Sequence, residues 1–139
     1  MLTPKKSLGQ NFLIDRNIIK KIVRLANIEN QKILEIGPGT GNLTEEIINK
    51  KPNKMIIIEK DEILSNKIKD KYEKNKNVIV KCMDALIYNF EKDDINIIIS
   101  NLPYNISIDL IYKILLSDKH FTKLIFMVQK ERIQTQELH

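Results

Sequence analysis

Five short apolar runs constrain the fold of this chain more than any other feature. The runs lie at Lys32 to Gly37, Lys54 to Lys60, Asn77 to Cys82, Ile95 to Ser100 and Lys123 to Val128. Their apolar residues are continuous rather than alternating, which is typical of parallel strands that are buried on both faces.

Helical patterns separate these runs. Asp15 can cap a first helix that continues to Ala26. Three more helices are expected at Leu43 to Lys50, at Glu62 to Lys74, and at Ser107 to Leu116, where Ser107 is the expected cap. Strands that alternate with helices indicate right-handed βαβ units and a doubly wound, mainly parallel sheet of the α/β class. We interpret the lysine-rich stretch 67–77 as the solvated face and end of a helix rather than a binding patch.

Composition excludes some kinds of site. The chain has 139 residues, enough for one domain, and a formal net charge of +5, which favours a polyanionic partner only weakly because AT-rich coding also enriches lysine. Cys82 is the one cysteine, and His120 and His139 lie far from other ligand-type residues, so we expect neither an internal disulfide nor a metal site. We find no membrane-spanning run or leader pattern, and we expect a cytoplasmic monomer that does not bind membranes.

A glycine-rich loop follows the first expected strand. The segment "LEIGPGTGNLTEE" places Gly37, Gly39 and Gly41 between a strand and a helix, where glycine allows a tight turn and close approach of a ligand to the main chain. A simple strand-to-helix turn would explain the loop alone equally well.

Polar residues end the next three expected strands. Glu59 lies where an acidic residue can hold ribose hydroxyls, Asp84 follows the third strand, and Asn101 ends the fourth. Alone, Glu59 could be a surface carboxylate and Asp84 the cap of a short helix. Together with the glycine loop, they predict one ligand crevice at the carboxyl edge of the sheet.

Two ligand classes fit this crevice. A dinucleotide would place its pyrophosphate on the loop, but its G-x-G-x-x-G pattern requires glycine at position 42, where this chain has Asn42. The G-P-G-T-G loop therefore favours S-adenosylmethionine, and an oxidoreductase is the least favoured reading.

The tetrapeptide "NLPY" suits chemistry on an exocyclic adenine amine. The Asn101 side-chain oxygen and the Leu102 carbonyl could accept the two N–H groups of the amine, and Pro103 would fix the backbone. Tyr104 offers a face on which an extruded base could stack. The competing interpretation is a proline turn with Tyr104 in the core.

At these residues the chain resembles the rRNA adenine dimethyltransferases of the KsgA type. The matching stretches are "KKSLGQNFLID", "ILEIGPGTGNLTEEI", "IIEKD", "CMDAL", "SNLPYNIS" and "FMVQKE", in family order over nearly the whole chain. The resemblance implies a Rossmann-like methyltransferase fold, S-adenosylmethionine as donor, and dimethylation of adjacent adenines near the 3′ end of small-subunit rRNA during ribosome biogenesis. One departure is Ile108, where the family pattern leads us to expect threonine.

The resemblance also implies site residues. Asn11 and Leu13 match positions that close over the donor. Gly37, with Gly39 in the same loop, matches the loop contact. Glu59 matches the ribose ligand, and Asp84 the ligand of the adenine ring. Asn101 matches the catalytic amide and also lies beside the donor's methyl group, while Tyr104 matches the base-stacking aromatic.

Two alternatives to this function stay open. One is the macrolide-resistance type of enzyme, which methylates large-subunit rRNA, although "GQNFL" and "NLPY" favour the small-subunit enzyme; a DNA adenine methyltransferase would more typically show "PPY". The other is a non-catalytic rRNA-binding assembly factor that retains the fold.

We also expect residues 1–139 to be the N-terminal part of a methyltransferase domain, truncated after the fifth strand, because family members continue with further strands and a helical C-terminal domain.

Overall fold

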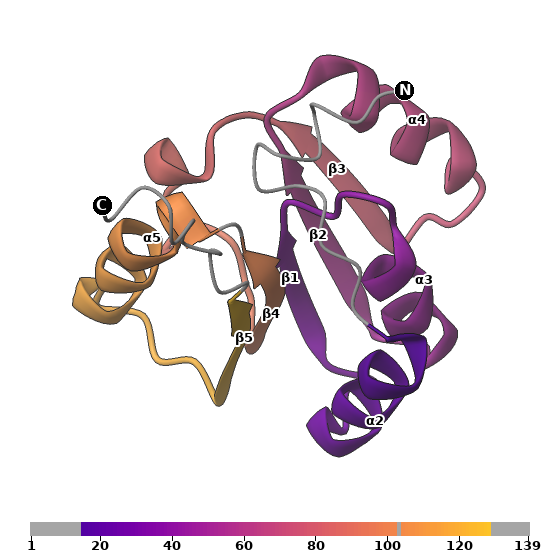
Figure 1. The fold of residues 1–139 in the computed structure, drawn as a ribbon, viewed down its shortest axis with the longest axis horizontal. Helices are drawn as coiled ribbons and strands as arrows, with labels where there is room; N and C mark the ends of the chain where they lie inside the picture. The colour runs from indigo at the N-terminus through magenta and orange to yellow at the C-terminus, as the bar shows by residue number, and fades with distance from the viewer. Residues whose placement is uncertain (1–14, 103, 129–139) are drawn as a thin grey trace, which may run out of the picture.

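The structure is a computed structural model, and it describes residues 15–102 and 104–128. Its elements in chain order are α2 (Arg16–Ala26), β1 (Lys32–Ile36), α3 (Asn42–Asn49), β2 (Lys54–Glu59), α4 (Glu62–Lys71), β3 (Val78–Cys82), the 3₁₀ helix η2 (Ala85–Ile87), β4 (Ile97–Leu102), α5 (Tyr104–Leu116) and β5 (Lys123–Val128) (Figure 1). All five expected strands and all four expected helices are present.

The five strands form one parallel sheet in the order β3-β2-β1-β4-β5. β1 lies at the centre, where Leu34 pairs with Ile56 of β2 on one side and Ile98 of β4 on the other. The chain reverses its direction of travel across the sheet after β3, which creates a topological switch point between the carboxyl ends of β1 and β4, where open α/β sheets generally bind ligands.

Helices cover both faces of the sheet. Helices α2, α3 and α4 pack on one face through Ile19, Val23, Ile47 and Ile68, against alternate strand residues that include Ile33, Ile57 and Ile99. On the other face, η2 and α5 pack through Ala85, Leu110 and Ile114, against a set that includes Leu34, Ile56 and Ile98. Figure 1 shows α5 on the opposite side of the sheet from α2 and α3. The prediction of a doubly wound parallel sheet is confirmed.

The strands are not equally buried. β1, β2 and β4 are buried on both faces, as their continuous apolar runs predict, whereas the residues of β3 and β5 are half-buried or exposed. The difference follows from position, because β3 and β5 are the edges of the sheet within the part of the chain that the structure describes.

Helix ends follow the capping chemistry of the sequence at two sites and depart from it at a third. Asp15 accepts a hydrogen bond from the Asn17 amide (2.8 Å) at the start of α2, and Asp61 accepts one from the Leu64 amide (3.0 Å) at the start of α4. The prediction that Ser107 caps the last helix is wrong. α5 begins three residues earlier, and the Ser107 hydroxyl donates to the Tyr104 carbonyl (3.0 Å), a back-bond that a serine inside a helix can form.

Several expectations fall on residues outside the described ranges. These are the donor-closing residues Asn11 and Leu13 and the tetrapeptide residue Pro103. Among the described helices, none has the length and apolar character needed to cross a membrane.

Candidate functional site

The candidate site is built on the carboxyl ends of four parallel strands. Three hydrogen bonds hold these ends together. The Gly37 amide after β1 donates to the Ile58 carbonyl of β2 (2.8 Å), and the Met83 amide after β3 donates to the Glu59 carbonyl (3.0 Å). The buried Ser100 hydroxyl of β4 donates to the carbonyl of Ile36 in β1. The predicted site residues on these four strands therefore lie along one edge of a connected framework.

The glycine loop leaves open space above its backbone. Gly37, Gly39 and Gly41 all have left-handed φ angles, of 65°, 57° and 88°. A Cβ atom built at any of the three would meet nothing within 4 Å. Side chains other than glycine would be strained at these φ angles, so the sequence requirement is conformational, and the open space allows a ligand to approach the main chain.

Glu59 ends β2 with a largely buried carboxylate. Its Oε2 accepts a hydrogen bond from the Asp61 amide (2.8 Å), and the residue is only 8% exposed. Burial raises the pKa of Glu59, while the hydrogen bond from the Asp61 amide opposes that rise. A carboxylate oxygen has two lone pairs, so Glu59 can also accept from a hydroxyl group of a ligand.

Asp84 caps a short helix and keeps a second, solvent-accessible carboxylate oxygen. Its Oδ1 accepts from the Leu86 amide (2.9 Å) and caps η2, as the structural interpretation predicts. Its Oδ2 lies 3.7 Å from Lys60 Nζ, an ion pair in which both side chains are solvent-accessible. Such exposed pairs are weak, so Oδ2 can exchange the lysine for a ligand.

Asn101 carries an unsatisfied acceptor. Its Oδ1 atom is buried and has no hydrogen-bond partner among the described residues. Burying an amide oxygen without a partner costs about 1–3 kcal/mol, and groups of this kind are found where a ligand completes the bonding.

Leu102, the next residue, is fully buried in the core, and Tyr104 is 46% exposed at the first position of α5. The alternative of Tyr104 as a core aromatic is therefore wrong.

A buried polar pair behind the glycine loop was missed by the sequence interpretation. Glu35 of β1 is 1% exposed, and the Thr44 hydroxyl of α3 donates to its Oε1 (2.5 Å). Burial raises the pKa of Glu35 to about 8, the Thr44 hydrogen bond opposes the rise, and the charge of Glu59 adds to it. A glutamate between Leu34 and Ile36 in a run expected to be buried on both faces was the signal that could have revealed this pair.

No cluster of three or more histidine, cysteine, aspartate or glutamate side chains suited to a metal ion occurs in residues 15–102 and 104–128. The candidate site presents main-chain groups, two carboxylates, one amide and one aromatic ring.

The parallel sheet with helices on both faces has the Rossmann-like methyltransferase fold of the α/β class. Two solved structures support this class. A dimethyladenosine transferase from Plasmodium falciparum is 33% identical with a TM-score of 0.74, over 86% of this chain and 43% of that one. The 23S rRNA methyltransferase ErmE is 26% identical with a TM-score of 0.73, over 87% of this chain and 49% of that one.

The chain belongs to the ribosomal RNA adenine dimethylase family, whose model matches residues 1–136. Among its relatives, ribosomal RNA small subunit methyltransferase A of Mycoplasma mobile is 47% identical over 127 residues, which cover 91% of this chain and 49% of the relative. The protein of the same name from Pelagibacter ubique is 43% identical over 130 residues, which cover 91% of this chain and 50% of the relative. The chain thus spans about half the length of the curated relatives it matches.

Proposed function

We propose that this chain is the catalytic part of an S-adenosylmethionine-dependent enzyme that dimethylates adenines of small-subunit rRNA. The observation that carries the proposal is the buried, unpartnered Oδ1 of Asn101. It lies on the strand-end framework that also presents the glycine loop and Glu59, in a chain of the rRNA adenine dimethylase family.

The donor fits the residues that are present. S-adenosylmethionine supplies an electrophilic methyl group when it is bound. Gly37 and Gly39 leave room for its amino-acid part against the main chain, as the empty space at their Cβ positions indicates. Glu59 Oε1 accepts from the ribose hydroxyls, and Asp84 Oδ2 accepts from the exocyclic amine of the donor's adenine. Asn11 and Leu13 are assigned to closing over the donor on the family resemblance alone.

The acceptor base is held by the tetrapeptide. Asn101 Oδ1 and the Leu102 carbonyl accept the two N–H groups of the target amine and draw its nitrogen toward tetrahedral geometry. The nitrogen lone pair then attacks the methyl carbon while the carbon–sulfur bond breaks and its electron pair stays on sulfur. The amine proton leaves to water, because the nitrogen becomes acidic once it carries the methyl group. A second round on the same nitrogen gives the dimethylated base.

Tyr104 supplies the surface for the base. Its ring is about half exposed at the start of α5, two residues after Leu102. Base–aromatic stacking contributes about 1–3 kcal/mol, enough to offset part of the cost of unstacking a base from RNA. Pro103 is assigned to fixing the backbone between these two residues, on the grounds of the tetrapeptide sequence.

Small-subunit rRNA is the favoured substrate. Relatives named for the small subunit are 38–47% identical to this chain, whereas the large-subunit enzyme ErmE is 26% identical. Methylation of large-subunit rRNA is the second candidate, because ErmE shares the fold with a TM-score of 0.73. We further propose a cytoplasmic monomer that acts on the pre-ribosomal small subunit.

The test is transfer of tritiated methyl groups from S-adenosylmethionine to purified small or large ribosomal subunits that lack the modification. Since the chain spans about half of its relatives, it is assayed both alone and joined to the second half of the Mycoplasma mobile relative. We expect label in small subunits. Label confined to large subunits would support the second candidate, and binding of rRNA without label from either protein would support a non-catalytic factor.

A further inference from the structure

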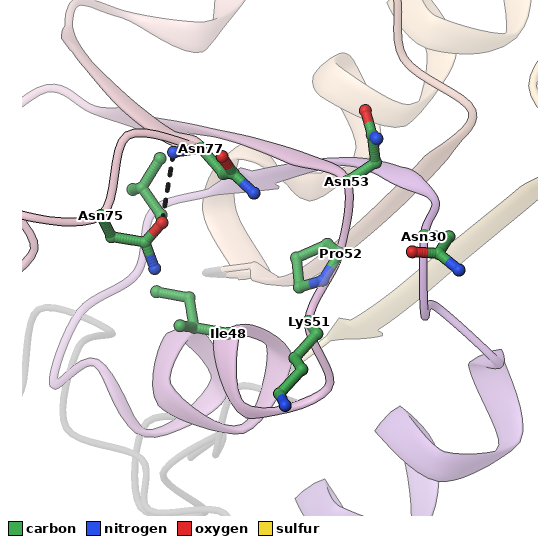
Figure 2. A pocket seen from close by; sticks show the side chains of 8 residues that line it. Asn30, Ile48, Lys51, Pro52, Asn53, Asn75 and Asn77 are labelled. Atoms are coloured by element: carbon green, nitrogen blue, oxygen red, sulfur yellow. Dashed lines mark hydrogen bonds between the residues drawn. The ribbon is translucent and has the colours of Figure 1, made fainter.

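A pocket lies at the opposite edge of the sheet from the candidate methyltransferase site. It has a volume of about 350 Å³ and is formed where the chain enters β1, β2 and β3 (Figure 2). Small-molecule sites begin at about this size, roughly 300 Å³. The strands of five or six residues separate the two sites by roughly 17–20 Å at about 3.3 Å per residue. None of the residues that line the pocket was assigned a role by the family resemblance.

The floor of the pocket is apolar. Ile48 of α3, the half-buried Val78 of β3 and the buried ring of Pro52 contribute this surface. Figure 2 shows the Pro52 ring between the amides of Asn75 and Asn77 on one side and Asn30 on the other. Because Pro52 is buried, the pocket offers a ligand mainly its polar walls.

Four amides form the walls. Asn30, Asn53, Asn75 and Asn77 line the pocket from three different loops. The Asn75 Oδ1 accepts from the Asn77 main-chain amide (3.2 Å), which orders that wall. The side chains of Asn30, Asn53 and Asn77 make no hydrogen bond with any residue in 15–102 or 104–128. Each amide both donates and accepts, so the walls can match the mixed donor and acceptor edges of a base.

The pocket lies among lysine-rich segments of the chain. Lys51 lines it, and Lys50, Lys74 and Lys76 are exposed neighbours in sequence of the lining residues. None of these four lysines is in any ion pair among the described residues. Unpaired lysines beside an amide-lined cavity favour an anionic ligand such as the phosphate of a nucleotide.

The backbone holds two of these side chains in an unusual conformation. Asn30 and Lys51 have left-handed φ angles of 62° and 55°, and the Asn30 amide donates to the Lys51 carbonyl (3.1 Å). Asparagine tolerates this region but lysine adopts it rarely. The hydrogen bond thus joins the two turns that carry Asn30 and Lys51 beside the same pocket.

We propose that this pocket binds an unpaired nucleotide of the RNA substrate, with its base among the four asparagine amides and its phosphate at Lys51. The proposal rests on the proposed function for the identity of the nucleic acid. Sequence-specific recognition of RNA targets unpaired nucleotides whose bases are splayed outward, and this pocket offers an apolar surface, amides and a cation to one of them. An RNA bound here and at Tyr104 would contact both edges of the sheet, which would set the distance between the recognised nucleotide and the methylated base.

The binding test compares two matched double variants. Lys51→Gly with Asn53→Ala removes one ammonium and one amide from the pocket, and glycine accepts the left-handed backbone at position 51. Lys67→Ala with Asn66→Ala removes the same two groups from the exposed surface of α4. Affinity for a short, fluorescein-labelled, adenine-rich single-stranded RNA is measured by anisotropy, with no methyl donor present.

We expect the pocket variant to bind this RNA roughly tenfold more weakly, the change expected when a charge-assisted contact and a hydrogen bond are lost. The α4 variant should stay within about twofold of the wild type. Equal losses in both variants, or no loss in the pocket variant, would overturn the proposal. Because the assay contains no donor, a failure of methyl transfer to rRNA leaves this result intact, so the two proposals fail separately.

Crosslinking tests the pocket in the wild-type chain, so its result does not depend on whether a variant folds. The same RNA carrying 4-thiouridine is irradiated with the wild-type chain, and the adducts are mapped by mass spectrometry. Adducts in residues 48–53 or 75–78 support the pocket, and adducts confined to the segment around Tyr104 overturn it. The single variant Lys51→Gly should also reduce the salt dependence of binding by about one phosphate contact.

Discussion

Replacing Glu35 with glutamine should remove a pH dependence from the stability of the fold. Glu35 is buried beneath the glycine loop, where its one hydrogen-bonding partner among the described side chains is Thr44. Burial raises its pKa from 4.5 to about 8. The folded chain therefore keeps a proton on Glu35 over a pH range in which the unfolded chain has already lost it.

The magnitude follows from linkage. Where the folded state binds more protons than the unfolded state, stability falls as the pH rises. With pKa values of 4.5 unfolded and about 8 folded, the contribution of Glu35 is fully present below pH 4.5 and is lost progressively up to pH 8. Between pH 5 and pH 7 the loss amounts to about 2.5 kcal/mol. Glutamine has nearly the same shape and does not titrate, so the variant should lack this slope.

The assay is urea unfolding followed by far-ultraviolet circular dichroism at several values between pH 5 and pH 8. Between pH 5 and pH 7 the wild type should lose about 2.5 kcal/mol more than Glu35→Gln does. Glu59, whose pKa burial also raises, is present in both proteins, so the comparison isolates Glu35. The exposed control Glu29→Gln should keep the wild-type slope. Equal slopes in the wild type and Glu35→Gln would refute a protonated, buried Glu35.

Two further predictions concern the donor and the base. Glu59→Gln should weaken binding of S-adenosylhomocysteine by about tenfold to a hundredfold in calorimetry, because the ribose hydroxyls lose a charged acceptor. The affinity of the wild type for S-adenosylhomocysteine should fall as the pH is lowered toward the raised pKa of Glu59, and the variant should show no such fall. NAD should bind neither protein. Preferential binding of NAD would contradict the donor assignment. Tyr104→Phe should keep most methyl-transfer activity and Tyr104→Ala should lose most of it, because the ring provides the stacking surface. Equal inactivity of the two variants would show that the tyrosine acts through its hydroxyl group.

The parallel sheet could be predicted because its signal is local. Each buried strand is a continuous apolar run, and each helix follows with its own periodicity. The burial of Ile56 or Ile98 can therefore be predicted from its own run, without knowledge of the strands beside it. The sequence could not distinguish the edge strands β3 and β5 from the central ones, because sheet order depends on how the chain crosses between strands. The start of α5 was misplaced because serine is common both at helix caps and inside helices, where Ser107 bonds back to Tyr104.

The site was predictable to the extent that it lies at strand ends. Gly37, Glu59, Asp84 and Asn101 each follow an apolar run, and parallel strands bring such residues to one edge. The Glu35–Thr44 pair and the amide-lined pocket were not predicted, because both join segments whose proximity only the fold reveals. Asn75 and Asn77 lie within the stretch that the sequence presented as a solvated helix end, and the structure places them opposite Asn30, in one pocket.

The central claim is that Asn101 positions an adenine amine of small-subunit rRNA for methyl transfer. The most direct measurement is the yield of dimethyladenosine, by mass spectrometry of digested rRNA, after small subunits react with S-adenosylmethionine and either the wild type or Asn101→Ala. Both proteins are joined to the second half of the Mycoplasma mobile relative, and binding of the small subunit is measured in parallel. The account predicts dimethyladenosine from the wild type, and from the variant a rate at least about a hundredfold lower with nearly unchanged rRNA binding, since the hydrogen bonds of Asn101 strengthen in the transition state. Dimethyladenosine formed by Asn101→Ala at the wild-type rate would contradict it.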